Sequence, residues 1–340
     1  MNVTAVSVLI CTYNRAGLLR ETLAAFTNLA PPDDCDVELI VVDNNSTDNT
    51  PRVIADAAQR SAFRIVLLHE RAQGKSFALN RGLEVARGDV IALTDDDVWP
   101  DREWLRRIVQ RFREDDLTFV FGKVLPRWGT QPPPELLTAP AQDIWGPLAL
   151  VDYGDEPTPY RMESTGQRLP IGANLAFARK PIVAVGGWRT DLGKVDNTLT
   201  SGEDHEIFYR LRRFNLYRGF YDPAITVRHY VPARRLTRKY FRQWFFWSGK
   251  THALMLDALY PHLDMPHVSR IAGTPRFLWR QALVQLGRWL KTRWPGTPAL
   301  EALAEELRLL QYFGIVVGCA KRRHGAVRPQ PATRHSPQAT

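Results

Sequence analysis

Three consecutive carboxylates, Asp95, Asp96 and Asp97, follow directly after an apolar stretch at residues 90–94. A short apolar stretch with β-branched residues is typical of a buried strand. Neighbouring carboxylates repel one another unless a positive group lies among them, and a divalent cation that holds a diphosphate would supply that charge. The alternative is a helix cap, for which one acid suffices. The pattern therefore favours a site for a cation and a diphosphate.

A second acidic pair, Glu203 and Asp204, opens a predicted helix whose apolar residues Ile207, Phe208 and Leu211 share one face. Acids at the start of a helix can simply stabilise its N-terminus. A carboxylate in that place can also take a proton from a reacting hydroxyl. Further along, His229 follows a strand-like segment at 224–228, and a lone histidine is more often structural than a ligand.

The first third of the chain alternates predicted strands and helices. The strands are 5–11, 37–42, 63–68 and 90–94, and the helices are 15–29, 48–59, 74–85 and 104–112. Such repetition predicts a parallel sheet with helices on both faces. Ligands of these sheets bind at the carboxyl ends of the strands, which is where the three acids fall.

Polar residues follow the other strands as well. Thr12, Tyr13 and Arg15 offer an aromatic face for a base and a guanidinium for phosphate. Asp43 ends the second strand, whereas residues 46–48 are expected to cap the next helix. Positive charge follows the third strand between 71 and 75. The first turn lacks the G-x-G-x-x-G pattern, which argues against a dinucleotide-binding dehydrogenase, and the chain has no P-loop.

The second half begins with a predicted strand at 119–125 and a stretch rich in Pro, Trp and Gly at 126–160. This stretch is either a lid or a long irregular connection. Trp128 and Trp145 could stack on sugars or fill the core. The basic loop at 232–238 offers Arg234 or Arg235 to a diphosphate, or is simply solvated.

Composition indicates a folded protein of one large domain, or of one domain with an appendage. The three cysteines show no metal-ligand spacing, and their odd number favours a reducing compartment. The first residues read as a strand and not as a secretion signal, and no apolar run reaches membrane-spanning length. We therefore expect a cytoplasmic location, with possible peripheral attachment to the inner face of the plasma membrane.

Charge is concentrated at the end of the chain. Residues 267–340 contain twelve Lys and Arg but three acids, which accounts for the whole net charge of +9. The helix predicted within 275–294 carries Trp279, Leu283, Leu286 and Leu290 on one stripe beside basic residues. Such a helix suits an anionic membrane surface, or it covers the domain that precedes it. No nucleic-acid motif accompanies the charge, so we expect no nucleic-acid partner.

Seven sites along the chain, in order, resemble the inverting glycosyltransferases of family 2, which have the GT-A fold. They are residues 7–15, 41–50, 74–82, 88–97, 170–176, 202–210 and His229, so the resemblance spans roughly residues 5–250. It implies an α/β fold with a GT-A-type, mostly parallel sheet flanked by helices. The expected organisation is a catalytic domain at 1–235, a basic helical C-terminal region at 236–325 and a disordered tail at 326–340.

The resemblance also implies roles for individual residues. Asp97 and His229 would hold Mg²⁺ or Mn²⁺, Asp204 would be the base, Glu203 would lie beside it, and Gly172 and Asn174 would line the acceptor side. Donor-binding residues would be Thr12, Tyr13, Arg15, Asp43, Lys75, Asn80, Asp95 and Asp96. One departure is Leu79, where the family often has Arg, so Arg71 or Lys75 would contact the donor phosphates instead.

The predicted function is metal-dependent transfer of a sugar, with inversion, from a nucleotide-sugar donor to a hydroxyl of a glycan or lipid-linked acceptor in cell-surface glycan or glycolipid synthesis. One alternative is a non-catalytic sugar-nucleotide or glycan-binding protein of the same fold, which the joint presence of Asp97, Asp204 and His229 disfavours. Another is a sugar nucleotidyltransferase, which would need a Gly-rich basic turn after the first strand.

Overall fold

The computed structural model describes residues 1–161, 169–194, 199–263 and 265–324, so the tail predicted to be disordered lies outside the described residues. Its centre is a nine-stranded sheet in the order β3-β2-β1-β4-β8-β6-β9-β5, with β7 paired to β9. The strands are β1 (Ala5–Thr12), β2 (Asp36–Asp43), β3 (Arg64–His69), β4 (Val90–Asp95), β5 (Val98–Pro100), β6 (Phe119–Trp128), β7 (Thr158–Tyr160), β8 (Leu175–Ala178) and β9 (Gly219–Val231).

One half of the sheet, from β3 to β4, is parallel throughout. Its four strands match the predicted ones to within one residue at each end. They were predictable because β1, β2 and β4 are almost continuous apolar runs, as strands buried on both faces must be. Parallel pairing brings the ends of β1, β2 and β4 to the same edge, with Cys11 opposite Asp95.

The other half is mixed. Strand β8 runs antiparallel to both of its neighbours, β4 and β6, whereas β6 and β9 are parallel. The pairing of β6 with β9 shifts register after Phe121, and a Cβ at Gly122 would collide with the carbonyl oxygen of Ile225. Glycine is therefore needed where the two backbones approach most closely.

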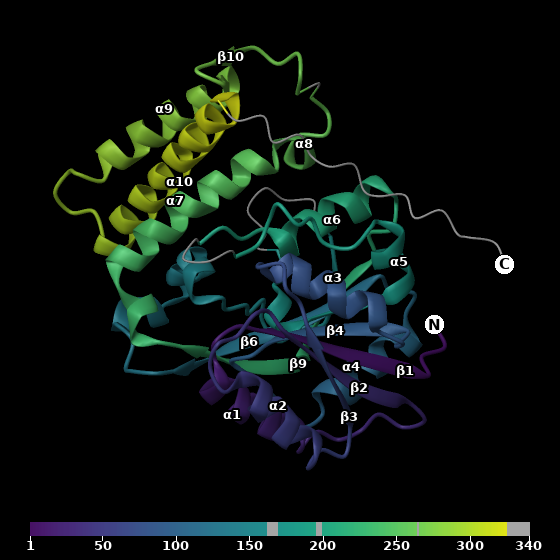
Figure 1. Ribbon diagram of the computed structural model, residues 1–340. Coiled ribbons are helices and arrows are strands. Elements are labelled where there is room, and N and C mark those ends of the chain that lie inside the picture. The colour runs from purple at the N-terminus through teal and green to yellow at the C-terminus, as the bar shows by residue number, and fades with distance from the viewer. Residues whose placement is uncertain (162–168, 195–198, 264, 325–340) are drawn as a thin grey trace.

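Helices cover both faces of the sheet (Figure 1), with α1 and α2 on one side and α3, α5 and α6 on the other. Their bounds are α1 (Ala16–Phe26), α2 (Thr50–Ala58), α3 (Lys75–Val85), α4 (Trp104–Glu114), α5 (Arg179–Ala184) and α6 (Glu203–Arg213). Each buries an apolar stripe, such as Leu19, Leu23 and Phe26 of α1. Phe26 meets Trp104 edge to face, which places α4 beside α1.

The stretch between β6 and β7 is an irregular connection of three short 3-10 turns, Pro134–Leu137, Ala139–Ile144 and Gly146–Leu148. Trp128 and Trp145 are half-buried and pack against the hydrophobic core, and the indole N–H of Trp145 donates to the carbonyl of Leu136. Of the two roles predicted for these tryptophans, the structure supports core packing.

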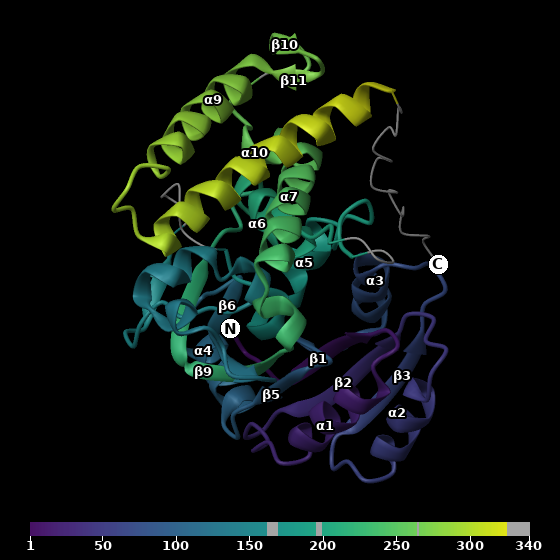
Figure 2. The ribbon, with the colours of Figure 1, turned by 90° about the vertical axis from the view of Figure 1, so that its left-hand side faces the viewer.

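The chain ends in a helical layer made of α7 (Arg238–Leu254), α8 (Leu256–Leu259), α9 (Arg276–Lys291) and α10 (Ala299–His324), with a small hairpin of β10 (Arg270–Ile271) and β11 (Thr274–Pro275). Figure 2 shows α10 crossing over α7, with α9 on its outer side. The crossing is close: a Cβ at Gly249 of α7 would collide with the backbone of Gln311, and one at Gly314 of α10 with that of Phe246. Within the described part of the chain, no helix is both long enough and apolar enough to cross a membrane.

Candidate active site

The three acids at the end of β4 differ in their surroundings. The hydroxyl of Thr12 donates to Asp96 (2.8 Å), and the guanidinium of Arg15 donates to both Asp96 (2.8 Å) and Asp97 (2.7 Å). Burial and the neighbouring charge of Asp97 raise the pKa of Asp96 to about 6, although Arg15 opposes the shift. Asp96 is thus an internal anchor of the acidic turn, and Thr12 and Arg15 support it.

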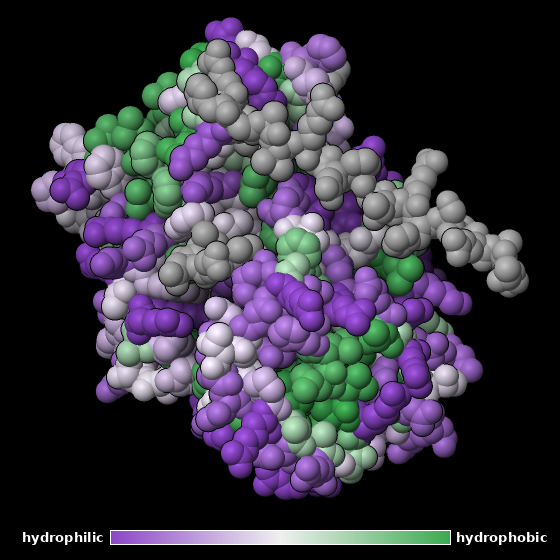
Figure 3. Space-filling model, viewed as in Figure 1, coloured by the Kyte–Doolittle hydropathy of each residue, from purple (hydrophilic) through white to green (hydrophobic). Residues whose placement is uncertain are grey.

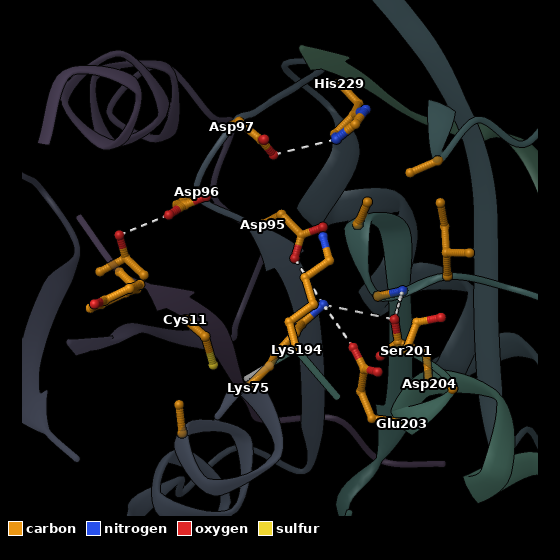
Figure 4. A pocket seen from close by; sticks show the side chains of 18 of the residues that line it. Cys11, Lys75, Asp95, Asp96, Asp97, Lys194, Ser201, Glu203, Asp204 and His229 are labelled. Atoms are coloured by element: carbon orange, nitrogen blue, oxygen red, sulfur yellow. Dashed lines mark hydrogen bonds and ion pairs between the residues drawn. The ribbon is translucent and has the colours of Figure 1, made fainter. Parts of the chain in front are cut away.

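Strand register brings Asp97 to His229. Directly after Asp97 the chain forms β5, whose Val98 pairs with His229 of β9, and the amide of Tyr230 donates to the carbonyl of Asp97. As a result Oδ1 of Asp97 lies 3.5 Å from Nε2 of His229, and both side chains are buried (Figure 4). The two predicted metal ligands, 132 positions apart in the sequence, therefore lie side by side.

The chemistry of this pair fits a divalent cation. Burial lowers the pKa of His229 to about 4, so the imidazole is neutral at physiological pH and able to bind a metal. Its Nδ1 is buried without a hydrogen-bond partner. Across the described residues there is no cluster of three or more His, Cys, Asp or Glu that could hold an ion unaided. A cation here would thus take its remaining ligands from a bound diphosphate and water.

The second acidic centre is the first turn of α6. Glu203 and Asp204 follow Gly202, whose φ of +103° lets the chain turn into the helix. Neither side chain caps the helix: Oδ2 of Asp204 accepts the amide N–H of Gly172 (2.9 Å), while its Oδ1 is buried without a partner. Burial and the charge of Asp204 raise the pKa of Glu203 to about 7. Asp204 is therefore oriented by one oxygen and keeps the other available.

Lys75, the first residue of α3, links the two acidic centres. Its Nζ lies 3.1 Å from Asp95, 3.7 Å from Glu203 and 3.8 Å from Asp204, as the dashed lines of Figure 4 show. Burial alone would lower the pKa of Lys75, but the charges of Asp204, Asp95 and Glu203 raise it well above its ordinary value. The ammonium group offsets the mutual repulsion of acids from two segments, the end of β4 and the start of α6.

A cleft of about 320 Å³ joins these groups. Its predicted lining residues include Tyr13, Lys75, Asp97, Asp204 and His229. Sequence reasoning did not assign a role to several others, namely Cys11, Gly146, Pro147, Lys194, His205, Tyr240 and Trp244. Most of these come from the irregular connection and from α7, and their sequence patterns do not reveal which face turns toward the cleft. The thiol of Cys11 stays protonated, because burial raises its pKa.

The residues in two pairs of alternative donor-phosphate contacts differ in position. Lys75 lines the cleft whereas Arg71 does not, and Arg235 lines it whereas Arg234 does not. Arg235 is buried, with Nη1 3.5 Å from Nε2 of His229. Residues 46–48 were expected to cap the next helix; the carboxylate of Asp48 accepts the backbone N–H groups of Ala16 and Thr50, the first residues of α1 and α2, whereas the N-cap residue of α2 is Asn49.

Two predicted site residues are held by hydrogen bonds to other parts of the chain. The amide of Asn80, expected to bind the donor, instead holds both the N–H and the carbonyl of Trp188 (2.8 Å each). Asn174, expected to face the acceptor, is buried and bonds the indole of Trp104 and the carbonyls of Lys123 and Ile225. Both amides already have hydrogen-bond partners in distant parts of the chain. They therefore stabilise the walls of the cleft from outside it.

Asp43 is likewise absent from the lining of the cleft. It is buried, its Oδ1 accepts the amide N–H of Ser46 (3.0 Å), and its Oδ2 lies 3.8 Å from Nδ1 of His69. This carboxylate therefore shapes the loop after β2. Gly172, in contrast, lines the cleft beside Asp204, and its place on the acceptor side stays a prediction.

Comparisons with known proteins agree with this geometry. Residues 7–145 match the family model described as glycosyl transferase family 2. A glucosyl-dolichyl phosphate glucuronosyltransferase of Haloferax volcanii is 27% identical over 262 residues, which cover 75% of this chain and 78% of the relative. Succinoglycan biosynthesis protein ExoM of Rhizobium meliloti is 26% identical over 247 residues, or 73% of this chain and 74% of the relative.

Among solved structures, a mannosyltransferase from Pyrobaculum calidifontis, in complex with GDP-Man and Mn²⁺, has the same fold. The TM-score is 0.56 at 20% sequence identity, over 93% of this chain and 88% of the other. The likeness extends over the mostly parallel sheet and the flanking helices described above. Residues 7–145 thus resemble glycosyl transferase family 2, and the chain is a glycosyltransferase with the GT-A fold.

Proposed function

We propose that this glycosyltransferase moves a sugar from a nucleoside-diphosphate sugar to an acceptor hydroxyl with inversion at the anomeric carbon. In a single displacement, the attacking hydroxyl and the departing diphosphate lie on opposite sides of that carbon. The cleft offers a group for each: Asp204 at the start of α6, and the pair of Asp97 and His229 at the far end. The covalent intermediate of a double displacement is not required.

Asp204 is the residue that carries this proposal. Its Oδ2 is fixed by the N–H of Gly172, and its Oδ1 has no partner although it is buried in the wall of the cleft. A buried, unpartnered carboxylate oxygen is costly unless a substrate satisfies it. In the proposed step Oδ1 takes the acceptor proton, the acceptor oxygen bonds to the anomeric carbon, and the bond from that carbon to the diphosphate oxygen breaks.

Asp97 and His229 would hold Mg²⁺ or Mn²⁺, which when bound offsets the charge that builds up on the leaving diphosphate. The chain supplies further positive charge through Lys75 and Arg235, which line the same cleft. Arg15 already neutralises Oδ2 of Asp97. Support for the metal comes from the neutral imidazole beside a carboxylate, and from the Mn²⁺ named with the structurally similar mannosyltransferase.

We propose a glycan or lipid-linked acceptor, which the enzyme would meet as a peripheral protein at the cytoplasmic face of a membrane. The name of the Haloferax volcanii relative specifies a sugar carried on dolichyl phosphate. The name of ExoM refers to the synthesis of succinoglycan. Either acceptor presents a sugar hydroxyl, which is what Asp204 needs to deprotonate.

The test is transfer and donor hydrolysis with Mn²⁺ across a panel of nucleotide sugars. Asp204→Asn keeps the size and the oxygen that accepts from Gly172 but cannot take a proton. We expect transfer to fall about 1,000-fold, the range typical of a lost general base, while donor affinity changes little. Asp97→Ala should lose metal-dependent turnover altogether.

Asp56→Asn is the matched control, because Asp56 is exposed on α2 and does not line the cleft. Its activity should equal that of the wild type. Undiminished transfer by Asp204→Asn would reject the assignment of the base. Binding of nucleotide sugars without turnover by the wild type would instead favour a non-catalytic binding protein.

A further inference from the structure

Few residues of helix α9 are buried, although the helix carries many apolar side chains. Only Leu278 and Gln285 are buried. The exposed fractions are 64% for Leu283, 53% for Val284 and 50% for Leu290. Exposing a large aliphatic side chain to water is unfavourable, so a set of them on one helix suggests that a partner covers them.

These apolar residues form one continuous stripe. Trp279, Leu283, Leu286 and Leu290 recur at intervals of three and four, and Trp294, just beyond the helix, is 74% exposed. Basic residues border the stripe: Arg280, Arg288 and Lys291 are exposed, and none forms an ion pair with any residue that the structure describes. Figure 3 shows hydrophobic and hydrophilic surface interspersed over α9 at the upper left.

We infer that the outer face of α9 binds the surface of a bilayer that contains anionic phospholipids. Leucine and tryptophan on one flank with unpaired cations beside them are what an interfacial helix presents to acyl chains and headgroups. The charge agrees, because the net +9 of the chain arises entirely from residue 267 onward. A second copy of this chain would carry the same positive charge on this face, which opposes its pairing with itself.

The helical layer connects this face to the active site. Tyr240 and Trp244 on one side of α7 line the cleft, and the other side packs closely on α10 through Gly249 and Gly314. Helix α10 in turn packs against α9, where the amide of Gln285 donates to Glu305 (2.6 Å). A bilayer bound to α9 would thus hold the cleft in a fixed relation to membrane-borne acceptors. This last consequence rests on the proposed function, whereas the binding itself does not.

The test is flotation of the full-length protein with vesicles of phosphatidylcholine alone or with 30% phosphatidylglycerol, without donor or metal. The wild type should float only with the anionic vesicles, and less at high salt. Leu283→Ser, Leu286→Ser and Leu290→Ser together should abolish flotation. Arg280→Gln, Arg288→Gln and Lys291→Gln together should weaken it about 100-fold, at about fivefold per cation.

Matched controls remove the same chemistry elsewhere. Leu137→Ser, Val183→Ser and Phe214→Ser remove exposed apolar side chains, and Arg20→Gln, Arg52→Gln and Arg60→Gln remove exposed cations. Both control proteins should float like the wild type. Circular dichroism and melting temperature establish that every variant is folded. Quenching of tryptophan fluorescence by brominated phosphatidylglycerol, reduced in Trp294→Phe, gives a second readout of insertion.

Wild-type protein that stays with the soluble fraction, or α9 variants that float as well as the wild type, would overturn the inference. So would a dimer in sedimentation without vesicles that the leucine substitutions dissociate, because α9 would then cover a second copy. Transfer to a soluble acceptor analogue tests the proposed function separately from vesicle binding. The α9 variants should still transfer the sugar to this analogue. Failure of the wild type to transfer would count against the proposed function but would leave the inference of vesicle binding unaffected.

Discussion

The cleft and helix α9 handle charge in opposite ways. In the cleft, Asp95, Asp96 and Asp97 are matched by Lys75 and Arg15 at distances of 2.7 to 3.1 Å. On α9, cations stand in solvent beside exposed leucines. Buried and paired charge holds reactive groups in place, whereas unpaired charge beside apolar surface is suited to a partner. The three acids of the first region have partners within the chain, whereas the cations of the second need a partner from outside it.

Removal of the Lys75 ammonium group should have the largest effect on the cleft. Lys75→Met leaves Asp95, Glu203 and Asp204 close together without their shared cation. We expect it to lower the free energy of unfolding by about 3 kcal/mol. This value is the low end for a broken buried ion pair, because Lys75 is partly exposed. Turnover should also be lost. Urea unfolding and donor hydrolysis measure both. Lys180→Met, at an exposed position, should change neither stability nor turnover. Equal effects of the two substitutions would show that the contacts of Lys75 with the three acids do not stabilise the cleft.

A smaller loss of stability is expected at the contact between α7 and α10, which connects the cleft to α9. Gly249→Ala forces a methyl group against the backbone of Gln311, and overpacking of this kind costs about 1–3 kcal/mol. Gly17→Ala is the control, since a Cβ there meets nothing within 4 Å and alanine favours helix. Thermal unfolding should show destabilisation of the first and slight stabilisation of the second. An unchanged melting temperature for Gly249→Ala would mean that α7 and α10 do not pack as closely as described.

The pH dependence of stability should reveal the raised pKa of Glu203, the neighbour of Asp204. Glu203 has a raised folded-state pKa of about 7, against an ordinary value of 4.5, because of burial and the charge of Asp204. Its contribution to stability is therefore full below pH 4.5 and is lost as the pH rises to 7. Relative to Glu203→Gln, the wild type should lose about 2 kcal/mol between pH 5 and pH 8. Urea unfolding of both proteins at the two pH values measures this, and a constant difference would contradict it.

The smallest effect should follow replacement of the lone thiol in the cleft. Cys11 lines the cavity, but burial raises its pKa and keeps it protonated, so it is a poor nucleophile. Cys11→Ala should retain turnover within about threefold of the wild type and lose less than about 1.5 kcal/mol of stability. A loss of turnover as large as that of Asp204→Asn would mean that the thiol takes part in the reaction.

The parts of the molecule that were predictable from sequence are those set by local patterns. Apolar runs located β1, β2 and β4, and the acids at Asp97 and Asp204 stood out because each directly adjoins such a pattern. The meeting of Asp97 with His229 could only be expected from the resemblance to a family, because it depends on the pairing of β5 with β9.

The rest depended on contacts between distant segments. Asn80 and Asn174 have the residue type of ligand-binding groups, and nothing local shows that Trp188 and Trp104 already occupy their amides. Likewise, the aromatic residues of α7 do not indicate which of them face the cleft, since the glycines of α10 decide how α7 sits. Periodicity could not tell whether the stripe on α9 was buried or exposed, for the same reason.

The most direct test of the central claim is calorimetric titration of UDP and GDP into the protein, with and without Mn²⁺. If Asp97 and His229 together hold the cation that binds the diphosphate, one of these nucleotides should bind the wild type and Asp204→Asn equally well in the presence of Mn²⁺. Binding should then be weak without the metal, and weak in Asp97→Ala and His229→Ala. Binding that ignores Mn²⁺, or that survives both substitutions unchanged, would contradict the account.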